Sequence, residues 1–161
     1  AGVSETALPE GVRRVADTLA GLGHPSEVVM LPVTGRTAAD AASALGVQLG
    51  QIAKSIVFRR LADDAAVLVV TSGDRRVDEG KVSSLVGTVG RADADFVKAS
   101  TGFSIGGVSP VGHSSPPVML IDRELFRFDE IWAAAGHPYA LFPLAPSELE
   151  QLTGAPVAEV A

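Results

Sequence analysis

The segments Ser55-Ile56-Val57-Phe58 and Ala65-Ala66-Val67-Leu68-Val69-Val70-Thr71 are two β-rich runs near the middle of the chain. A polar segment, residues 59–64, separates them. Two such runs joined by a polar connection are typical of a β-hairpin with a longer loop. We therefore expect residues 55–58 and 65–71 to form neighbouring strands of one sheet.

Capping residues and apolar periodicity predict helices on both sides of this hairpin. Thr37 with Asp40 three residues later resembles a capping arrangement, and Asp78 and Asp93 can each cap a helix that follows. Glycines then end several of these segments. The expected helices cover residues 9–20, 37–45, 79–86, 94–100, 129–135 and 147–152. The expected further strands cover residues 26–31, 118–122, 139–144 and 157–160.

The order of these elements bounds the fold class. Strands and helices do not alternate strictly, so a doubly wound parallel sheet is not favoured. A mixed sheet with helices packed around it, an α/β fold of the α+β type, fits the order better. A chain of 161 residues can bury a real core, and we see no internal repeat or linker in it. We expect one domain over residues 1–161.

Composition excludes several kinds of chemistry and partner. The absence of cysteine rules out disulfides, thiolate metal sites and a cysteine nucleophile. A net charge of −6 argues against a protein that binds long nucleic-acid duplexes, but it allows one that binds a short single-stranded end of a nucleic acid. No apolar run approaches a membrane span and no signal pattern opens the chain. We expect a cytoplasmic protein without a membrane or DNA partner.

No common enzyme motif marks a site. The phosphate loop, the zinc-protease helix and the nucleophile elbow are all missing. His24, His113 and His137 are far apart in sequence, with no carboxylate spacing that would help them hold a metal. The basic pairs at 59–60 and 75–76 are most simply solvated surface charge. We expect no metal and no cofactor.

Residues 100–113, called the glycine loop below, read Ser-Thr-Gly-Phe-Ser-Ile-Gly-Gly-Val-Ser-Pro-Val-Gly-His. Four glycines and a proline alternate there with apolar residues. Such glycines suggest backbone brought close to another segment or to a ligand, and Pro110 would stiffen the turn. Exposed backbone N–H groups could then hold an anion or stabilise charge on a carbonyl oxygen. The alternative is a tight structural turn packed against a strand.

Lys54 leads into the otherwise apolar strand and has two interpretations. Its stem could extend to water, as long lysine side chains often do. Alternatively, a partly buried ammonium faces a pocket and positions an anionic or ester substrate. His113, beside the glycine loop, could act as a base, although a histidine in a surface turn is the commoner case. Asp74 is most simply a turn residue after a strand.

Three stretches in this order resemble the YbaK/ProX family, the free-standing relatives of the editing domain of bacterial prolyl-tRNA synthetases. They are Ala53-Lys54-Ser55-Ile56-Val57-Phe58, Gly73-Asp74-Arg75-Arg76-Val77-Asp78, and Ser100-Thr101-Gly102-Phe103 through Gly106-Gly107-Val108-Ser109-Pro110-Val111-Gly112. The resemblance covers about residues 8 to 155, and the glycine loop is its most specific part. It implies a compact α/β fold whose mixed sheet curls into a barrel-like shape surrounded by helices.

The resemblance also implies an activity. Members of the family hydrolyse the ester of misacylated tRNA, so we expect a trans-acting deacylase that removes alanine, serine, threonine or cysteine, with proline tRNA as the expected carrier. The expected partners are the 3′ aminoacyl end of that tRNA and prolyl-tRNA synthetase. The family needs no protein nucleophile or metal. Its lysine holds the substrate and its loop positions the ester for attack by a water or a substrate hydroxyl.

Carried onto this sequence, the family pattern implies Lys54, Gly106 and Gly107 as the catalytic residues. The residues expected to bind or shape the substrate pocket come from the same loop: Gly102, Phe103, Val108, Ser109, Pro110 and His113.

Two segments depart from the branch of the family that clears cysteine from proline tRNA. Tyr139-Ala140-Leu141-Phe142 stands where that branch usually carries Gly-Leu-Asp, and Met30-Leu31-Pro32 stands where it tends to carry an aromatic residue. The substrate amino acid therefore stays open. Two other functions stay open as well: a non-catalytic module that binds aminoacyl-tRNA or a synthetase, and hydrolysis of another small ester.

Overall fold

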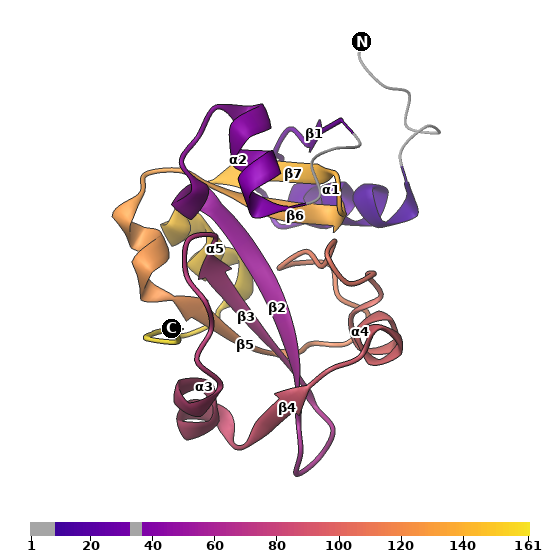
Figure 1. Ribbon diagram of the computed structural model, residues 1–161. Helices are drawn as coiled ribbons and strands as arrows, with labels where there is room; N and C mark the ends of the chain where they lie inside the picture. The colour runs from indigo at the N-terminus through magenta and orange to yellow at the C-terminus, as the bar shows by residue number, and fades with distance from the viewer. Residues whose placement is uncertain (1–8, 33–36) are drawn as a thin grey trace.

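The computed structural model describes residues 9–32 and 37–161, whose helices and strands are labelled in Figure 1. The helices are α1 (Glu10–Gly21), α2 (Ala38–Leu45), α3 (Glu79–Val86), α4 (Ala94–Thr101) and α5 (Pro146–Thr153). The strands are β1 (Val29–Met30), β2 (Ile52–Arg60), β3 (Ala66–Ser72), β4 (Val89–Arg91), β5 (Val118–Asp122), β6 (Ile131–His137), β7 (Ala140–Leu144) and β8 (Val157–Ala158). Two 3-10 helices lie at Leu49–Gln51 and Arg123–Arg127.

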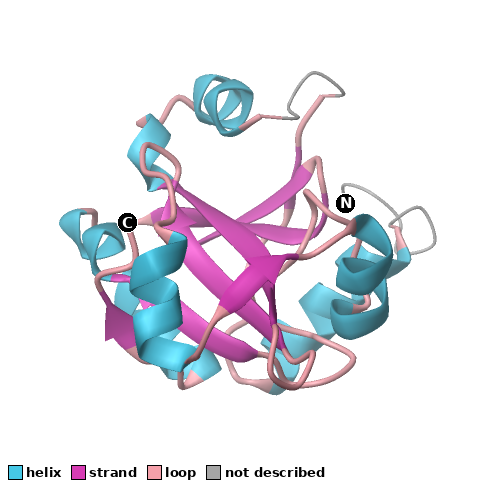
Figure 2. Ribbon diagram, turned by 60° about the horizontal axis from the view of Figure 1, so that its bottom comes forward, coloured by secondary structure: helices cyan, strands magenta, loops and turns pink. Residues whose placement is uncertain are grey.

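The strands form one mixed sheet in the order β1-β7-β6-β2-β3-β5-β8, with β4 added beside β2. The expected hairpin is its centre, since β2 and β3 pair antiparallel from Ala53 with Ser72 to Arg59 with Ala66. The pairs β2–β6, β3–β5 and β5–β8 are parallel. Helices lie around the twisted sheet (Figure 2), so the predicted mixed sheet with surrounding helices is confirmed.

One edge of β2 changes partner along its length. β6 pairs with Ile52 and Ala53, and β4 pairs with Phe58, Arg59 and Arg60. Between them, no described strand pairs with residues 54–57 on this edge.

The direction of the backbone groups in this gap follows from the hairpin ladder. The Arg60 N–H donates to the Ala65 carbonyl at 2.9 Å, so even-numbered residues of β2 bond to β3. The odd-numbered residues Ser55 and Val57 therefore turn their backbone N–H and C=O groups toward the gap.

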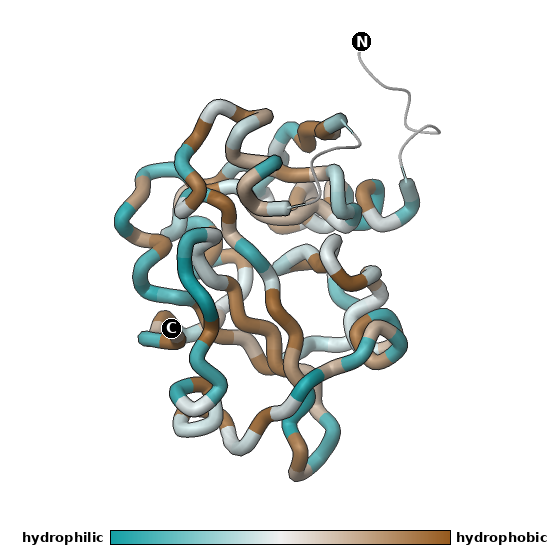
Figure 3. The backbone as a smooth tube through the Cα atoms, viewed as in Figure 1, coloured by the Kyte–Doolittle hydropathy of each residue, from teal (hydrophilic) through white to brown (hydrophobic). Residues whose placement is uncertain are grey.

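The apolar residues of the hairpin run into the interior (Figure 3). β3 is apolar on both faces, and Val67, Leu68, Val69 and Val70 are all fully buried. The largest core cluster lies on the α1 side of the sheet, a second lies on the α3 side, and a third lies beneath α2. A strand covered on both faces needs a continuous apolar run, and the sequence supplies one in residues 65–71.

Capping chemistry places several helices as the sequence predicts. The Thr37 hydroxyl accepts the Asp40 N–H at 3.0 Å. Asp78 and Asp93 each accept the backbone N–H three residues later.

No helix within residues 9–32 and 37–161 has the length and apolar character needed to cross a bilayer.

The helix expected over residues 129–135 is wrong, because Ile131–His137 is strand β6. The alanine-rich sequence has high helix propensity, but β6 lies between β7 and β2 and takes its structure from them. Its burial alternates as in a strand, with Ile131, Ala133 and Ala135 fully buried. The strand expected over 26–31 is limited to Val29–Met30, and β4 was not predicted.

Helix α1 and β6 come into main-chain contact at two glycines. A Cβ atom at Gly11 would overlap the Gly136 carbonyl, and a Cβ at Gly136 would overlap the Gly11 carbonyl. Gly136 also has a φ of 89°, a left-handed conformation that disfavours any other residue. The apolar side of α1, with Val12, Val15 and Leu19 fully buried, can reach the sheet only because both positions lack side chains.

We predict that Gly136→Ala lowers the free energy of unfolding by more than about 2 kcal/mol, because it adds both an overlap and a strained φ. Urea unfolding followed by circular dichroism measures the change. Gly21→Ala is the matched control, since a Cβ at Gly21 would meet no atom within 4 Å. Equal midpoints for the two variants would contradict the packing described above.

Candidate functional site

A cavity of about 350 Å³ opens at the gap in the edge of β2. Its walls come from β2, α2, α4, the segment 105–108, β6 and β7. Most of the lining side chains are apolar and small, including Ala41, Val97, Val108 and Ala134. The volume lies in the range of about 300–1,000 Å³ that is typical of small-molecule sites.

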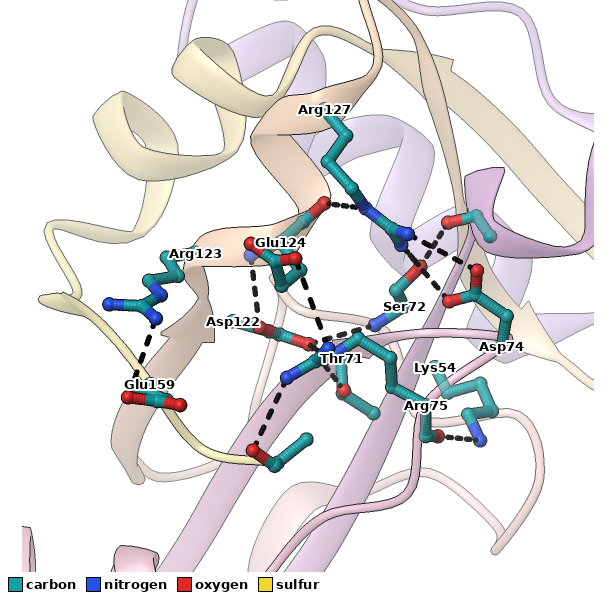
Figure 4. Close-up of polar contacts among 12 residues, drawn as sticks. Lys54, Thr71, Ser72, Asp74, Arg75, Asp122, Arg123, Glu124, Arg127 and Glu159 are labelled. Carbon is teal, nitrogen blue, oxygen red and sulfur yellow. Dashed lines mark hydrogen bonds and ion pairs between the residues drawn. The ribbon is translucent and has the colours of Figure 1, made fainter.

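Lys54 is the cationic residue among the described residues that line this cavity. Its ammonium donates a hydrogen bond to the Arg75 carbonyl at 3.0 Å (Figure 4). Burial lowers the pKa of Lys54 below that of an ordinary lysine, and the nearby Asp74 carboxylate partly opposes this shift. The side chain is therefore half-buried beside the cavity and does not extend freely into water.

A buried carboxylate holds the turn that carries the Arg75 carbonyl. Asp122, at the end of β5, is fully buried and accepts the Thr71 hydroxyl at 2.8 Å and the Glu124 N–H at 3.0 Å. The Arg75 guanidinium lies 3.4 Å from the same carboxylate (Figure 4). Because a buried charge is tolerated only with such partners, Asp122 ties β3, β5 and the Arg75 turn together.

Arg127 fixes the same turn from the other side. Its guanidinium donates to the Ser72 hydroxyl at 2.8 Å and to the Asp74 carboxylate at 3.0 Å. The Arg127 hydrogen bonds lower the pKa of Asp74, which keeps that carboxylate charged. Asp74 is thus more than a turn residue: it links Arg127 to the surroundings of Lys54.

The glycine loop forms part of the cavity wall. Gly106 lines the cavity with a φ of 88°, and a Cβ there would meet no atom within 4 Å, so no protein atom fills the space beside it. Gly107 packs away from it. A Cβ at Gly107 would lie 2.8 Å from the His137 carbonyl carbon and 2.9 Å from the Pro138 ring. The loop therefore packs against the turn between β6 and β7.

The structure brings Lys54, Gly106 and Val108 together at the cavity. The other six residues singled out from the sequence are not among those that line it: Gly102, Phe103, Gly107, Ser109, Pro110 and His113. Pro110 and His113 instead line a separate surface cavity. Gly102 ends α4 in a left-handed conformation, with a φ of 83°.

Phe103, Ser109 and His113 belong to the part of the glycine loop that packs into the protein and does not line the cavity. Phe103 is 1% exposed, and the Arg14 guanidinium lies 4.2 Å above its ring. His113 Nε2 lies 2.6 Å from the Ser109 carbonyl, and its ring meets Phe103 edge-on. Burial lowers the pKa of His113, so the neutral ring donates to that carbonyl. This contact fastens the loop.

Ser55 is a cavity residue that sequence reasoning treated only as part of a strand. Its hydroxyl is buried and has no hydrogen-bond partner among the described residues. A buried hydroxyl without a partner is costly, so a ligand that bonded to it would gain from doing so. Its signal in the sequence is a single polar residue within the apolar run that follows Lys54.

The two departing segments lie in different surroundings. In the Tyr139–Phe142 segment, Leu141 lines the cavity while Ala140 and Phe142 are fully buried in the core. Met30 is 39% exposed. Within the described residues, no group of three or more His, Asp or Glu side chains is placed to hold a metal ion.

The arrangement suits a ligand with a small apolar part and a polar or anionic part. The apolar walls take the first, while the Lys54 ammonium, the Ser55 hydroxyl and the open backbone of Gly106 are placed for the second. Donors of this kind, fixed around a largely apolar cavity, stabilise charge on a carbonyl oxygen better than water does.

Solved structures contain a close match to this fold. A crystal structure described as that of a "putative trans-editing enzyme for prolyl tRNA synthetase" is 44% identical, with a TM-score of 0.91. The match covers 96% of this chain and 98% of that one.

Sequence relatives agree with it. "Uncharacterized protein YwhH" of Bacillus subtilis is 33% identical over 129 residues, which cover 80% of this chain and 82% of that protein. A proline–tRNA ligase of Thermoanaerobacter sp. is 28% identical over 105 residues, which cover 63% of this chain but only 18% of the ligase. The family model described as "Aminoacyl-tRNA editing domain" matches residues 33–152. The chain therefore belongs to the aminoacyl-tRNA editing domain family, as its resemblance to the YbaK/ProX proteins implied.

Proposed function

We propose that this protein is a trans-acting deacylase that hydrolyses the ester between a small mischarged amino acid and the 3′ end of a tRNA. The observation that carries the proposal is the Lys54 ammonium, half-buried beside an apolar cavity that Gly106 of the glycine loop also lines. Membership of the editing-domain family supports the same reaction.

Lys54 acts as a positioning cation in this reaction. One of its three N–H groups is taken by the Arg75 carbonyl, which leaves two for the substrate. The terminal ribose and its ester present oxygen acceptors that these donors can hold. Because the ammonium is half-buried, each such bond is stronger than it would be in water.

The chemical step needs no nucleophile from the protein. A water attacks the ester carbonyl carbon and gives up a proton, and negative charge develops on the carbonyl oxygen. The backbone of the glycine loop at Gly106, which lines the cavity, is the proposed stabiliser of that charge. The bond to the ribose oxygen then breaks and that oxygen takes a proton, so hydrolysis releases the free amino acid and a tRNA with a free hydroxyl. An aminoacyl ester is already activated, so positioning and polarisation suffice.

The walls of the cavity support a small amino acid as the one removed. Alanine side chains at 38, 41 and 134 and the valine at 97 leave a smooth apolar surface. The Ser55 hydroxyl adds one hydrogen-bonding group within it. We propose alanine, serine, threonine and cysteine as candidate substrates and proline tRNA as the carrier. The carrier rests on the likeness to part of proline–tRNA ligases, and the same likeness makes prolyl-tRNA synthetase the candidate partner.

We predict that Lys54→Ala lowers the rate of amino acid release from mischarged proline tRNA at least about a hundredfold, because the substrate loses its positioning group. The measurement is release from tRNA charged with alanine, serine, threonine or cysteine, after subtraction of spontaneous hydrolysis. Lys81→Ala is the matched control, since Lys81 bonds to Glu159 at 3.2 Å and does not line the cavity.

Three results would count against the proposal. Full activity in Lys54→Ala, with an unchanged unfolding midpoint, would remove lysine from the mechanism. Tight binding of the charged tRNA without release of any of the four amino acids would instead identify a non-catalytic binding module. Release from free aminoacyl esters as fast as from tRNA would indicate a general esterase.

We predict that catalytic efficiency falls at alkaline pH, at a lower pH than an ordinary lysine would give. Burial lowers the pKa of Lys54, so its positive charge is lost earlier as the pH rises. The Asp74 carboxylate favours the charged form. Asp74→Asn should therefore move the loss of activity to still lower pH. Single-turnover deacylation against pH measures both profiles, and a shift to higher pH in Asp74→Asn would contradict this role.

A further inference from the structure

A second cavity, of about 410 Å³, lies next to the first along the same strand. The two cavities share Lys54, Ile56 and Val57 among their lining residues. One ligand can therefore lie across these residues of β2 and enter both. The reaction proposed above uses only the first cavity.

Two arginines line the second cavity without protein partners. Arg76 follows the turn that accepts the Lys54 hydrogen bond, and Arg91 ends β4. Within the described part of the chain, neither side chain makes a hydrogen bond or ion pair. Other arginines do pair with carboxylates there, namely Arg59, Arg60, Arg75, Arg123 and Arg127. The two guanidinium groups are thus left available for a ligand.

Charge and shape in this cavity suit a nucleotide. Lys54, Arg76 and Arg91 are cationic, and Glu79 is the one acidic residue among the lining residues. This local excess of positive charge stands out in a chain whose net charge is −6. Arginine prefers phosphate, which its planar fork can bind through two hydrogen bonds.

The other lining residues of this cavity are mostly apolar, including Ile56, Val77 and Ala92. Phe58 pairs with Arg91 across β2 and β4, but it is only 8% exposed and belongs to a core cluster. Apolar surface beside cationic groups is part of the usual pattern of sites for single-stranded nucleic acid. Glu79 offers an acceptor for a ribose hydroxyl or a base amino group.

We propose that the second cavity binds the RNA strand directly next to the aminoacylated nucleoside, with Arg76 and Arg91 holding its backbone phosphate. This inference rests on the proposed function. The amino acid would occupy the first cavity, the terminal nucleoside would cross Lys54–Val57, and the phosphate that precedes it would lie between the two arginines. The site would select an RNA end over a free aminoacyl ester.

The test is binding of an oligoribonucleotide that ends in CCA and carries a fluorescent label at its 5′ end, followed by anisotropy. We expect Arg76→Ala and Arg91→Ala each to weaken binding about two- to fivefold, as for partly exposed charge pairs. Each should also reduce the dependence of log Kd on log salt by about 0.7, the value for one phosphate on a single strand. Arg59→Ala is the matched control, because Arg59 pairs with Asp64 and does not line the cavity.

A second RNA, with a neutral methylphosphonate at its last linkage, locates the contact. It should bind the unmodified protein more weakly, and the arginine substitutions should weaken it no further. If Arg76→Ala and Arg91→Ala bind the normal RNA as the unmodified protein does, or if Arg59→Ala loses as much, the phosphate site is wrong. If adenosine monophosphate competes as well as the unlabelled RNA, the cavity takes a free nucleotide and the RNA assignment is wrong.

These measurements separate the phosphate site from the proposed function. The RNA carries no aminoacyl ester, so an inactive protein with the expected arginine dependence would refute the deacylase and keep the site. An active deacylase without that dependence would do the reverse.

Discussion

The cavity exists because strand pairing stops on one edge of β2. β6 runs parallel to β2 and leaves it after Ala53, whereas β4 runs antiparallel and joins it only at Phe58. The backbone between them keeps its extended shape because β3 pairs with the whole of the other edge. Unpaired strand edges are normally covered or blunted, since they invite pairing with other chains. Here the glycine loop and α2 surround the open edge and convert it into a pocket.

Two sets of contacts, made by residues that do not line the pocket, hold its walls in place. The buried Asp122 and the exposed Arg127 hold the turn that receives the Lys54 hydrogen bond. On the opposite side, the contact between His113 and the Ser109 carbonyl holds the glycine loop from behind. Lys54 and Gly106, which both line the cavity, are thus held in place by the surrounding fold, and such a fixed arrangement is the condition for positioning a reactive ester.

Local signals predicted much of this structure, and tertiary context decided the rest. The hairpin and the capped helices follow from short-range chemistry, such as the Thr37 hydroxyl that accepts the Asp40 N–H. The sequence of β6 failed as a guide because alanine favours helices in isolation, and only neighbouring strands make it extended.

The candidate site divides in the same way. Lys54 and Gly106 carry recognisable signals, a lone cation in an apolar run and a glycine pair in an apolar loop. Asp122 and Arg127 act through residues more than 40 positions away in sequence, so no local pattern marks them. His113 and Phe103 belong to the same motif as Gly106, yet their side chains lie on the back of the loop. A motif identifies the segment, and the fold decides which face of it meets the ligand.

The contact between Gly11 and Gly136 has a consequence for local unfolding. Gly136 is followed by His137, whose backbone packs against Gly107, so helix α1, strand β6 and the glycine loop meet at one point through main-chain atoms. Contacts between main chains cannot be relieved by rotation of a side chain. Fraying of α1 would therefore loosen the wall of a cavity that α1 does not line. The N-terminal helix and the glycine loop, about ninety positions apart, should open and close as one cooperative unit in hydrogen exchange.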